Sequence, residues 1–80
     1  MRPRFPHTRD DVDRAVDGPF GLVVGDLDDG SIFVLRRPRR AGQSWTLTHW
    51  ADAARSRSLE ERTFAEGGEA RAAFLRGIGL

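Results

Sequence analysis

The stretch Pro19 to Arg37, PFGLVVGDLDDGSIFVLRR, constrains the fold of this chain more than any other segment. It holds two runs of apolar and β-branched residues, and Asp29-Gly30 lies between them. Such runs favour β-strands, and an Asp-Gly pair suits the positive φ angles of a two-residue type I′ turn. The stretch therefore predicts an antiparallel β-hairpin.

The turn also predicts the register of the hairpin. If Asp29 and Gly30 are the two loop residues, Val24 lies opposite Leu35. One face of the sheet then carries the expected core, which we assign to Phe20, Leu22, Val24, Phe33, Leu35, Leu47, Phe64 and Phe74. The opposite face carries a second apolar strip of Val23, Leu27, Ile32 and Val34. Because both faces are partly apolar, we expect the second face to be covered by a helix or by another copy of the chain in a homodimer.

The segments around the hairpin predict two helices and one or two more strands. Thr8 can cap a short helix over about residues 9–17, which Gly18-Pro19 would end. The alternation in QSWTLTHW predicts a strand over residues 43–50. Residues 58–64, SLEERTF, fit either a strand or the capped start of a helix, and we favour the strand because glycines follow it. The last helix is expected over about residues 69–76.

This order predicts the α+β class. We expect a small three- or four-stranded antiparallel sheet, arranged as a meander, with a short N-terminal helix and a C-terminal helix. Residues 1–7 are expected to form an extended tail, and residues 8–80 a single domain.

The C-terminal part, with a Trp-containing strand and the ending RTFAEGGEARAAF, resembles the strand-then-helix ending of several small sheet-and-helix DNA-binding domains. These include a plant-type DNA-binding domain and the arm-binding domains of phage integrases. The resemblance covers about residues 43–76. What it implies is the fold of this part of the chain, not a function.

Length and composition argue against several function classes. The chain has 80 residues, no cysteine and no apolar run near the roughly 20 residues of a membrane span. We expect a soluble, cytoplasmic chain without a membrane anchor. With two histidines and neither Cys nor Tyr, it offers few groups for acid–base or nucleophilic catalysis. His49 could pair with Asp52 or a serine, but we expect it to pack on its neighbours in a strand. We expect no enzyme and no cofactor.

The acidic run Asp26 to Gly30, DLDDG, carries carboxylate oxygens of the kind that bind calcium. A calcium-binding EF-hand loop needs a glycine at about the sixth position and a glutamate at about the twelfth. Counting from Asp26, these positions hold Ser31 and Arg37. We therefore interpret the run as a hairpin turn and expect no metal site.

Four arginines surround Pro38 in the stretch Leu35 to Trp45, LRRPRRAGQSW. Without them the chain keeps nine arginines against twelve acidic residues, a net charge of −3, so the excess positive charge is local. Guanidinium groups bind phosphates or carboxylates in a fork geometry, and proline stiffens a loop. Three interpretations stay open: a solvated strand connection, a contact for an acidic protein surface, and a contact for nucleic acid.

We expect a small non-enzymatic interaction or regulatory domain. A protein is favoured as its partner, and the expected contact residues are Arg36, Arg37, Arg39, Arg40 and Trp45. Self-association is expected through Val23, Leu27, Ile32 and Val34. The alternative is a nucleic-acid-binding accessory or regulatory protein that uses the same arginines.

Overall fold

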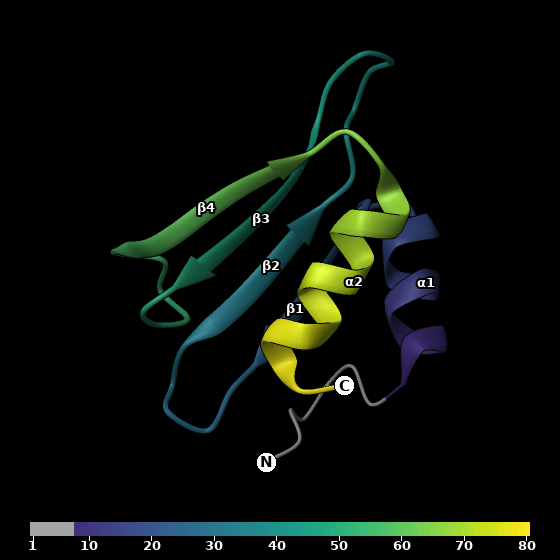
Figure 1. Cartoon of the computed structure of the whole chain (residues 1–80). Helices are drawn as coiled ribbons and strands as arrows, with labels where there is room; N and C mark the ends of the chain where they lie inside the picture. Colours follow the sequence, from purple (N-terminus) through teal and green to yellow (C-terminus); the bar gives the residue numbers. More distant parts are fainter. Residues whose placement is uncertain (1–7) are drawn as a thin grey trace.

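The computed structural model describes residues 8–80, so the expected tail of residues 1–7 lies outside the described residues. It shows the α+β class that the sequence predicts. The elements follow one another as α1 (Arg9–Asp17), β1 (Leu22–Asp26), β2 (Ile32–Arg36), β3 (Trp45–Trp50), β4 (Ser58–Phe64) and α2 (Gly67–Ile78). The strands form one antiparallel sheet in the order β1-β2-β3-β4, which is a meander (Figure 1).

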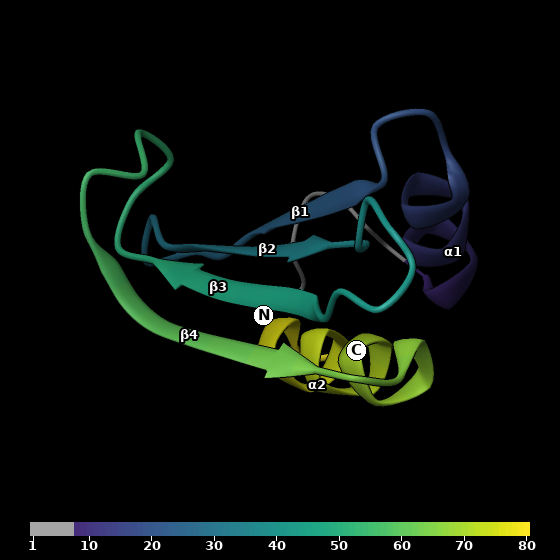
Figure 2. The same cartoon turned by 90° about the horizontal axis from the view of Figure 1, so that it is seen from above.

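Both helices pack on the same face of the sheet, which curves around α2 (Figure 2). We call this the helix face and the opposite side the open face. Buried Val12 and Val16 of α1 and Phe74 of α2 belong to one apolar cluster with Leu35 and the other core residues of the sheet. The sequence left two alternatives for the second apolar face, a helix or another copy of the chain. The prediction that a helix covers it is wrong, because both helices lie on the other face. Among residues 8–80 no helix is long and apolar enough to span a membrane.

Helix α1 begins and ends where its sequence predicts. The Thr8 hydroxyl accepts a hydrogen bond from the backbone N–H of Asp11, and the Asp11 carboxylate accepts one from the N–H of Thr8. This reciprocal capping box satisfies two backbone donors that the helix cannot pair internally. Gly18 follows the helix in an extended conformation and ends it.

The predicted register of the β1–β2 hairpin was wrong by one residue. The N–H of Leu27 donates to the carbonyl of Ser31 at 2.9 Å, so the loop contains three residues, Asp28 to Gly30, rather than two. Gly30 has φ +88, and the Asp29 carboxylate accepts a hydrogen bond from the Ser31 N–H at 2.9 Å. Three-residue hairpin loops commonly combine a tight turn with a glycine in the left-handed region. The extra loop residue places Val23 opposite Leu35.

A shift of one residue turns every side chain of β1 to the other face. Val23 and Gly25 therefore lie on the helix face, while Leu22 and Val24 lie half-buried on the open face. The burial of Leu35, Leu47 and Phe74 is confirmed, and Phe33 and Phe64 pack against the core as partly buried residues. Phe20 contradicts its predicted core position because it is 86% exposed.

The same shift divides the apolar strip that the sequence predicts. Val23 is fully buried beneath the helices and Leu27 packs against the core. Ile32 and Val34 lie on the open face and are only 3% and 4% exposed. The four residues therefore do not share one face of the sheet and do not form a single contact surface. Their role in self-association stays a prediction.

Strand β4 confirms the strand interpretation of residues 58–64. It pairs with β3, and a bulge near its start places Glu60 opposite His49 and Ser58 opposite Trp50. Its residues 58–63 are all exposed, and Phe64 is half-buried. Most of β4 is therefore held by its pairing with β3 rather than by burial of its side chains.

Candidate functional site

Residues 36–40, which we call the arginine loop, leave the end of β2 and lead toward β3. The connection projects beyond the sheet and the helices (Figure 1). It lies at the opposite end of β2 from the acidic turn at Asp28 and Asp29. The molecule thus has a basic end and an acidic end.

The four arginines differ in how the fold holds them. The N–H of Arg37 donates to the carbonyl of Gly21 at 2.7 Å, which ties the base of the loop to the start of β1. Gly21 has φ +63, and a Cβ there would lie 3.0 Å from the Arg37 Nε, so glycine lets this side chain lie against the backbone. Arg36 is half-buried, whereas Arg39 and Arg40 are exposed. A turn follows, in which Gly42 has φ +87 and the Gln43 N–H donates to the Arg40 carbonyl.

None of these four guanidinium groups forms an ion pair within residues 8–80. Four positive charges therefore lie close together without carboxylate partners in the described part of the chain. Such a cluster attracts solvent counterions and any anionic group that approaches it.

An exposed aromatic ring completes the site. Gly18, Pro19, Phe20 and Gly21 form a turn in which the Gly21 N–H donates to the Gly18 carbonyl at 3.2 Å. Phe20 occupies a corner of this turn and is 86% exposed. It borders a surface hollow of about 580 Å³, whose walls also include Pro19, Pro38, Arg36, Arg37 and Arg39. The hollow thus combines apolar and cationic walls.

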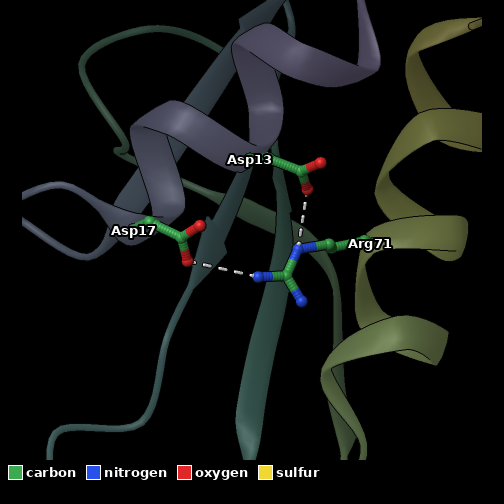
Figure 3. Close-up of polar contacts among 3 residues, drawn as sticks. All are labelled: Asp13, Asp17 and Arg71. Carbon is green, nitrogen blue, oxygen red and sulfur yellow. Dashed lines mark ion pairs between the residues drawn. The ribbon is translucent and has the colours of Figure 1, made fainter.

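Trp45, the aromatic residue that the sequence assigns to partner binding, lies elsewhere. It is on the helix face, half-buried, and the guanidinium of Arg71 lies 4.9 Å from the centre of its ring. Figure 3 shows Arg71 reaching from α2 to two carboxylates of α1, with Nε 3.1 Å from Asp13 and Nη2 3.5 Å from Asp17. The buried Nε makes no hydrogen bond of good geometry, so its contact with Asp13 is an ion pair. One face of Trp45 is therefore occupied by its own chain.

The sequence predicted a cluster of arginines in this loop but not the exposed position of Phe20 beside them. The signal was present, because Gly18-Pro19 before Phe20 and Gly21 after it indicate a turn, where a side chain has few neighbours. The following strand alternates regularly, and continuing this alternation back to Phe20 placed the residue on the expected core face.

The residues considered for catalysis are engaged in local structure. The ring of His49 stacks on Phe33 with centroids 4.1 Å apart, which confirms the expected packing. The Asp52 carboxylate accepts hydrogen bonds from the Ser56 hydroxyl at 2.7 Å and the Ser56 N–H at 3.3 Å, and these bonds lower the pKa of Asp52. The bonds from the Ser31 hydroxyl and N–H likewise lower the pKa of Asp29, whose turn role is confirmed. Residues 8–80 contain no cluster of three or more His, Asp or Glu side chains that could hold a metal ion.

Comparison with known proteins adds no relative: no family model, no curated protein and no solved structure matches this chain. The geometry of the site is therefore the basis for any statement about function.

Proposed function

We propose that the chain is a non-enzymatic interaction domain that binds an acidic segment of a protein partner through the arginine loop and Phe20. The observation that carries this proposal is the hollow in which Phe20 lies beside three of the four arginines without carboxylate partners. Burying an exposed aromatic ring and pairing isolated cations both favour association.

The two kinds of wall suit a peptide that carries both apolar and acidic side chains. An apolar side chain of the partner would displace water from Phe20 and the prolines, which bury area at little entropic cost because they are stiff. Carboxylates on either side would then accept paired hydrogen bonds from the guanidinium groups. Arginine and aromatic residues also dominate the binding energy of many protein interfaces.

The charge distribution supports a protein rather than a nucleic acid. Apart from the arginine loop the chain carries a net charge of −3, and acidic residues occupy the other end of the sheet. A nucleic-acid backbone would need a basic surface along several phosphates, and this negative charge would repel it. A second candidate is single-stranded nucleic acid, favoured by one observation: exposed Phe20 next to arginines could stack on a base.

Fluorescence anisotropy with labelled probes separates these candidates. The probes are short peptides that combine Asp or Glu with one Leu or Phe, oligo(dT), and a random DNA duplex. We expect an acidic peptide to bind, and the variants Arg39→Ala/Arg40→Ala and Phe20→Ala each to weaken it at least about tenfold. The matched control, Arg14→Ala/Arg57→Ala, removes two exposed arginines elsewhere and should bind like the parent.

The outcomes contradict the proposal in distinct ways. Binding of oligo(dT) with a steep salt dependence that the Arg39→Ala/Arg40→Ala variant flattens would support the nucleic-acid candidate instead. If acidic peptides bind the variants and the parent equally well, the arginine loop is a solvated connection between strands.

A further inference from the structure

The outer edge of β4 is open. Strand β4 is the last strand of the sheet, and within residues 8–80 no other strand pairs with its outer side. In both views no helix or loop lies along this side (Figures 1 and 2). Alternate residues of an edge strand direct backbone N–H and C=O groups outward, and these groups can pair with another strand. At seven residues, β4 is also the longest strand, so this edge offers the longest such row in the sheet.

The charged residues of β4 are placed on defined faces by their pairing with β3. Glu60 lies opposite His49 and Arg62 opposite Leu47, so both side chains belong to the helix face. Glu61 lies opposite Thr48 and belongs to the open face. All three are exposed and within reach of a strand added at the edge.

These positions are self-complementary in charge. When two copies of a strand pair in antiparallel fashion about a two-fold axis, one residue faces its own copy, and the residues on either side of it face each other. With Glu61 at the axis, Glu60 of each copy lies opposite Arg62 of the other, which gives two opposite-charge pairs on the helix face. Registers centred on Glu60 or on Arg62 also place one residue opposite its own like-charged copy, but they form neither Glu60–Arg62 pair. Of these three registers, charge therefore favours the one centred on Glu61.

We propose that a second copy of this chain pairs with β4 in this register and forms a homodimer with a continuous eight-stranded sheet. Opposite charges across neighbouring strands stabilise a sheet, and like charges destabilise it. The single like-charge contact is between the two copies of Glu61. In each copy Glu61 lines a hollow that Arg36 and Arg55 also line, and these cations would offset the repulsion. The proposal does not rest on peptide binding, although Arg36 lines the hollows of both sites. Because the two β4 strands run in opposite directions, the dimer carries its arginine loops at opposite ends.

A charge-exchange experiment tests this register in the full chain. Sedimentation velocity from about 10 µM to about 1 mM should show the parent in a monomer–dimer equilibrium. The variants Glu60→Arg and Arg62→Glu each place like charges at both pairs, and each should raise the dimer Kd at least about tenfold. An equimolar mixture of the two variants restores opposite charges at both pairs and should dimerise like the parent. Glu61→Gln removes the like-charge contact and should lower the Kd.

Two controls keep the test specific. Arg14→Glu changes an exposed charge on α1, away from β4, and should leave the Kd unchanged. Circular dichroism of each variant shows whether its monomer is folded. A parent that stays monomeric at all concentrations would overturn the proposal, and so would a mixture that dimerises no better than its separate components.

Discussion

Replacing Gly25 with alanine tests how α2 packs on the sheet. Gly25 is buried in β1 opposite Phe33, on the helix face. A Cβ at this position would lie 2.7 Å from the Cγ2 of Ile78 and 3.2 Å from the Cζ of Phe74. Ordinary contacts between carbon atoms are about 3.5–4.0 Å, and both neighbours are fully buried, so neither can move aside freely.

Two opposing effects determine the change in the free energy of unfolding. Alanine reduces the entropy of the unfolded chain and by itself stabilises a strand position by roughly 0.5–1 kcal/mol. Overpacking of a well-filled core costs about 1–3 kcal/mol. Because the added carbon is nearly 1 Å too close to Ile78, we expect the steric cost to dominate, with a net loss of about 1–2 kcal/mol. For a domain of this size that corresponds to a melting temperature lower by about 5–15 °C.

Thermal and urea unfolding followed by circular dichroism measure this change. Gly68→Ala is the matched control, because a Cβ there meets nothing within 4 Å, and it should raise the stability by about 0.5–1 kcal/mol. In the register that the sequence predicts, Gly25 would face away from the core and its replacement would stabilise the protein. A Gly25→Ala variant as stable as the parent would therefore refute the packing of α2 against β1.

Two further perturbations address the polar contacts. Arg71→Met keeps an apolar chain over Trp45 but removes the cation and its two ion pairs with partly exposed carboxylates, so we expect a loss of about 1–2 kcal/mol in urea unfolding. The loss should be smaller in an Asp13→Asn background, and equal losses in both backgrounds would contradict the ion pair. Asp29→Ala should lower the melting temperature at about pH 7 and have a smaller effect as the pH is lowered below the unfolded pKa, because a carboxyl group with a lowered pKa stabilises the fold above its unfolded pKa and loses this contribution as the pH falls. Asp28→Ala, at the neighbouring turn position, is the control, and a pH-independent effect of Asp29→Ala would argue against the turn hydrogen bonds.

The sequence by itself determined the order and the type of the elements. Their signals are local: Thr8 and Asp11 cap α1 through contacts three residues apart, and Gly18 ends it. The strand choice for β4 was also correct, because Thr63-Phe64 followed by glycines fits the end of a strand before a helix. Interactions of this kind form between residues that are close in the chain, so they can be predicted without knowledge of the fold.

Tertiary structure decided which faces of the elements are buried. Asp-Gly is compatible with both a two-residue and a three-residue loop, and the turn sequence does not distinguish them. Only the three-residue loop places Val23 and Gly25 against the helices, where Gly25 gives room to Ile78 and Phe74. That fit depends on α2, which lies far along the chain, and so it could not be predicted from the turn.

In the candidate site, too, some features could be predicted from the sequence and others depend on tertiary contacts. The arginine cluster could be predicted from the sequence because its members are neighbours in the chain, and its role in binding stays a prediction. The surroundings of two aromatic residues differ from those expected: one face of Trp45 lies against Arg71 from α2, and Phe20, expected in the core, lies at the surface. The role of Trp45 in partner binding stays a prediction. Exposure of an aromatic ring depends on what distant segments bring to it, and for Trp45 the decisive contact forms only when α2 packs on the sheet.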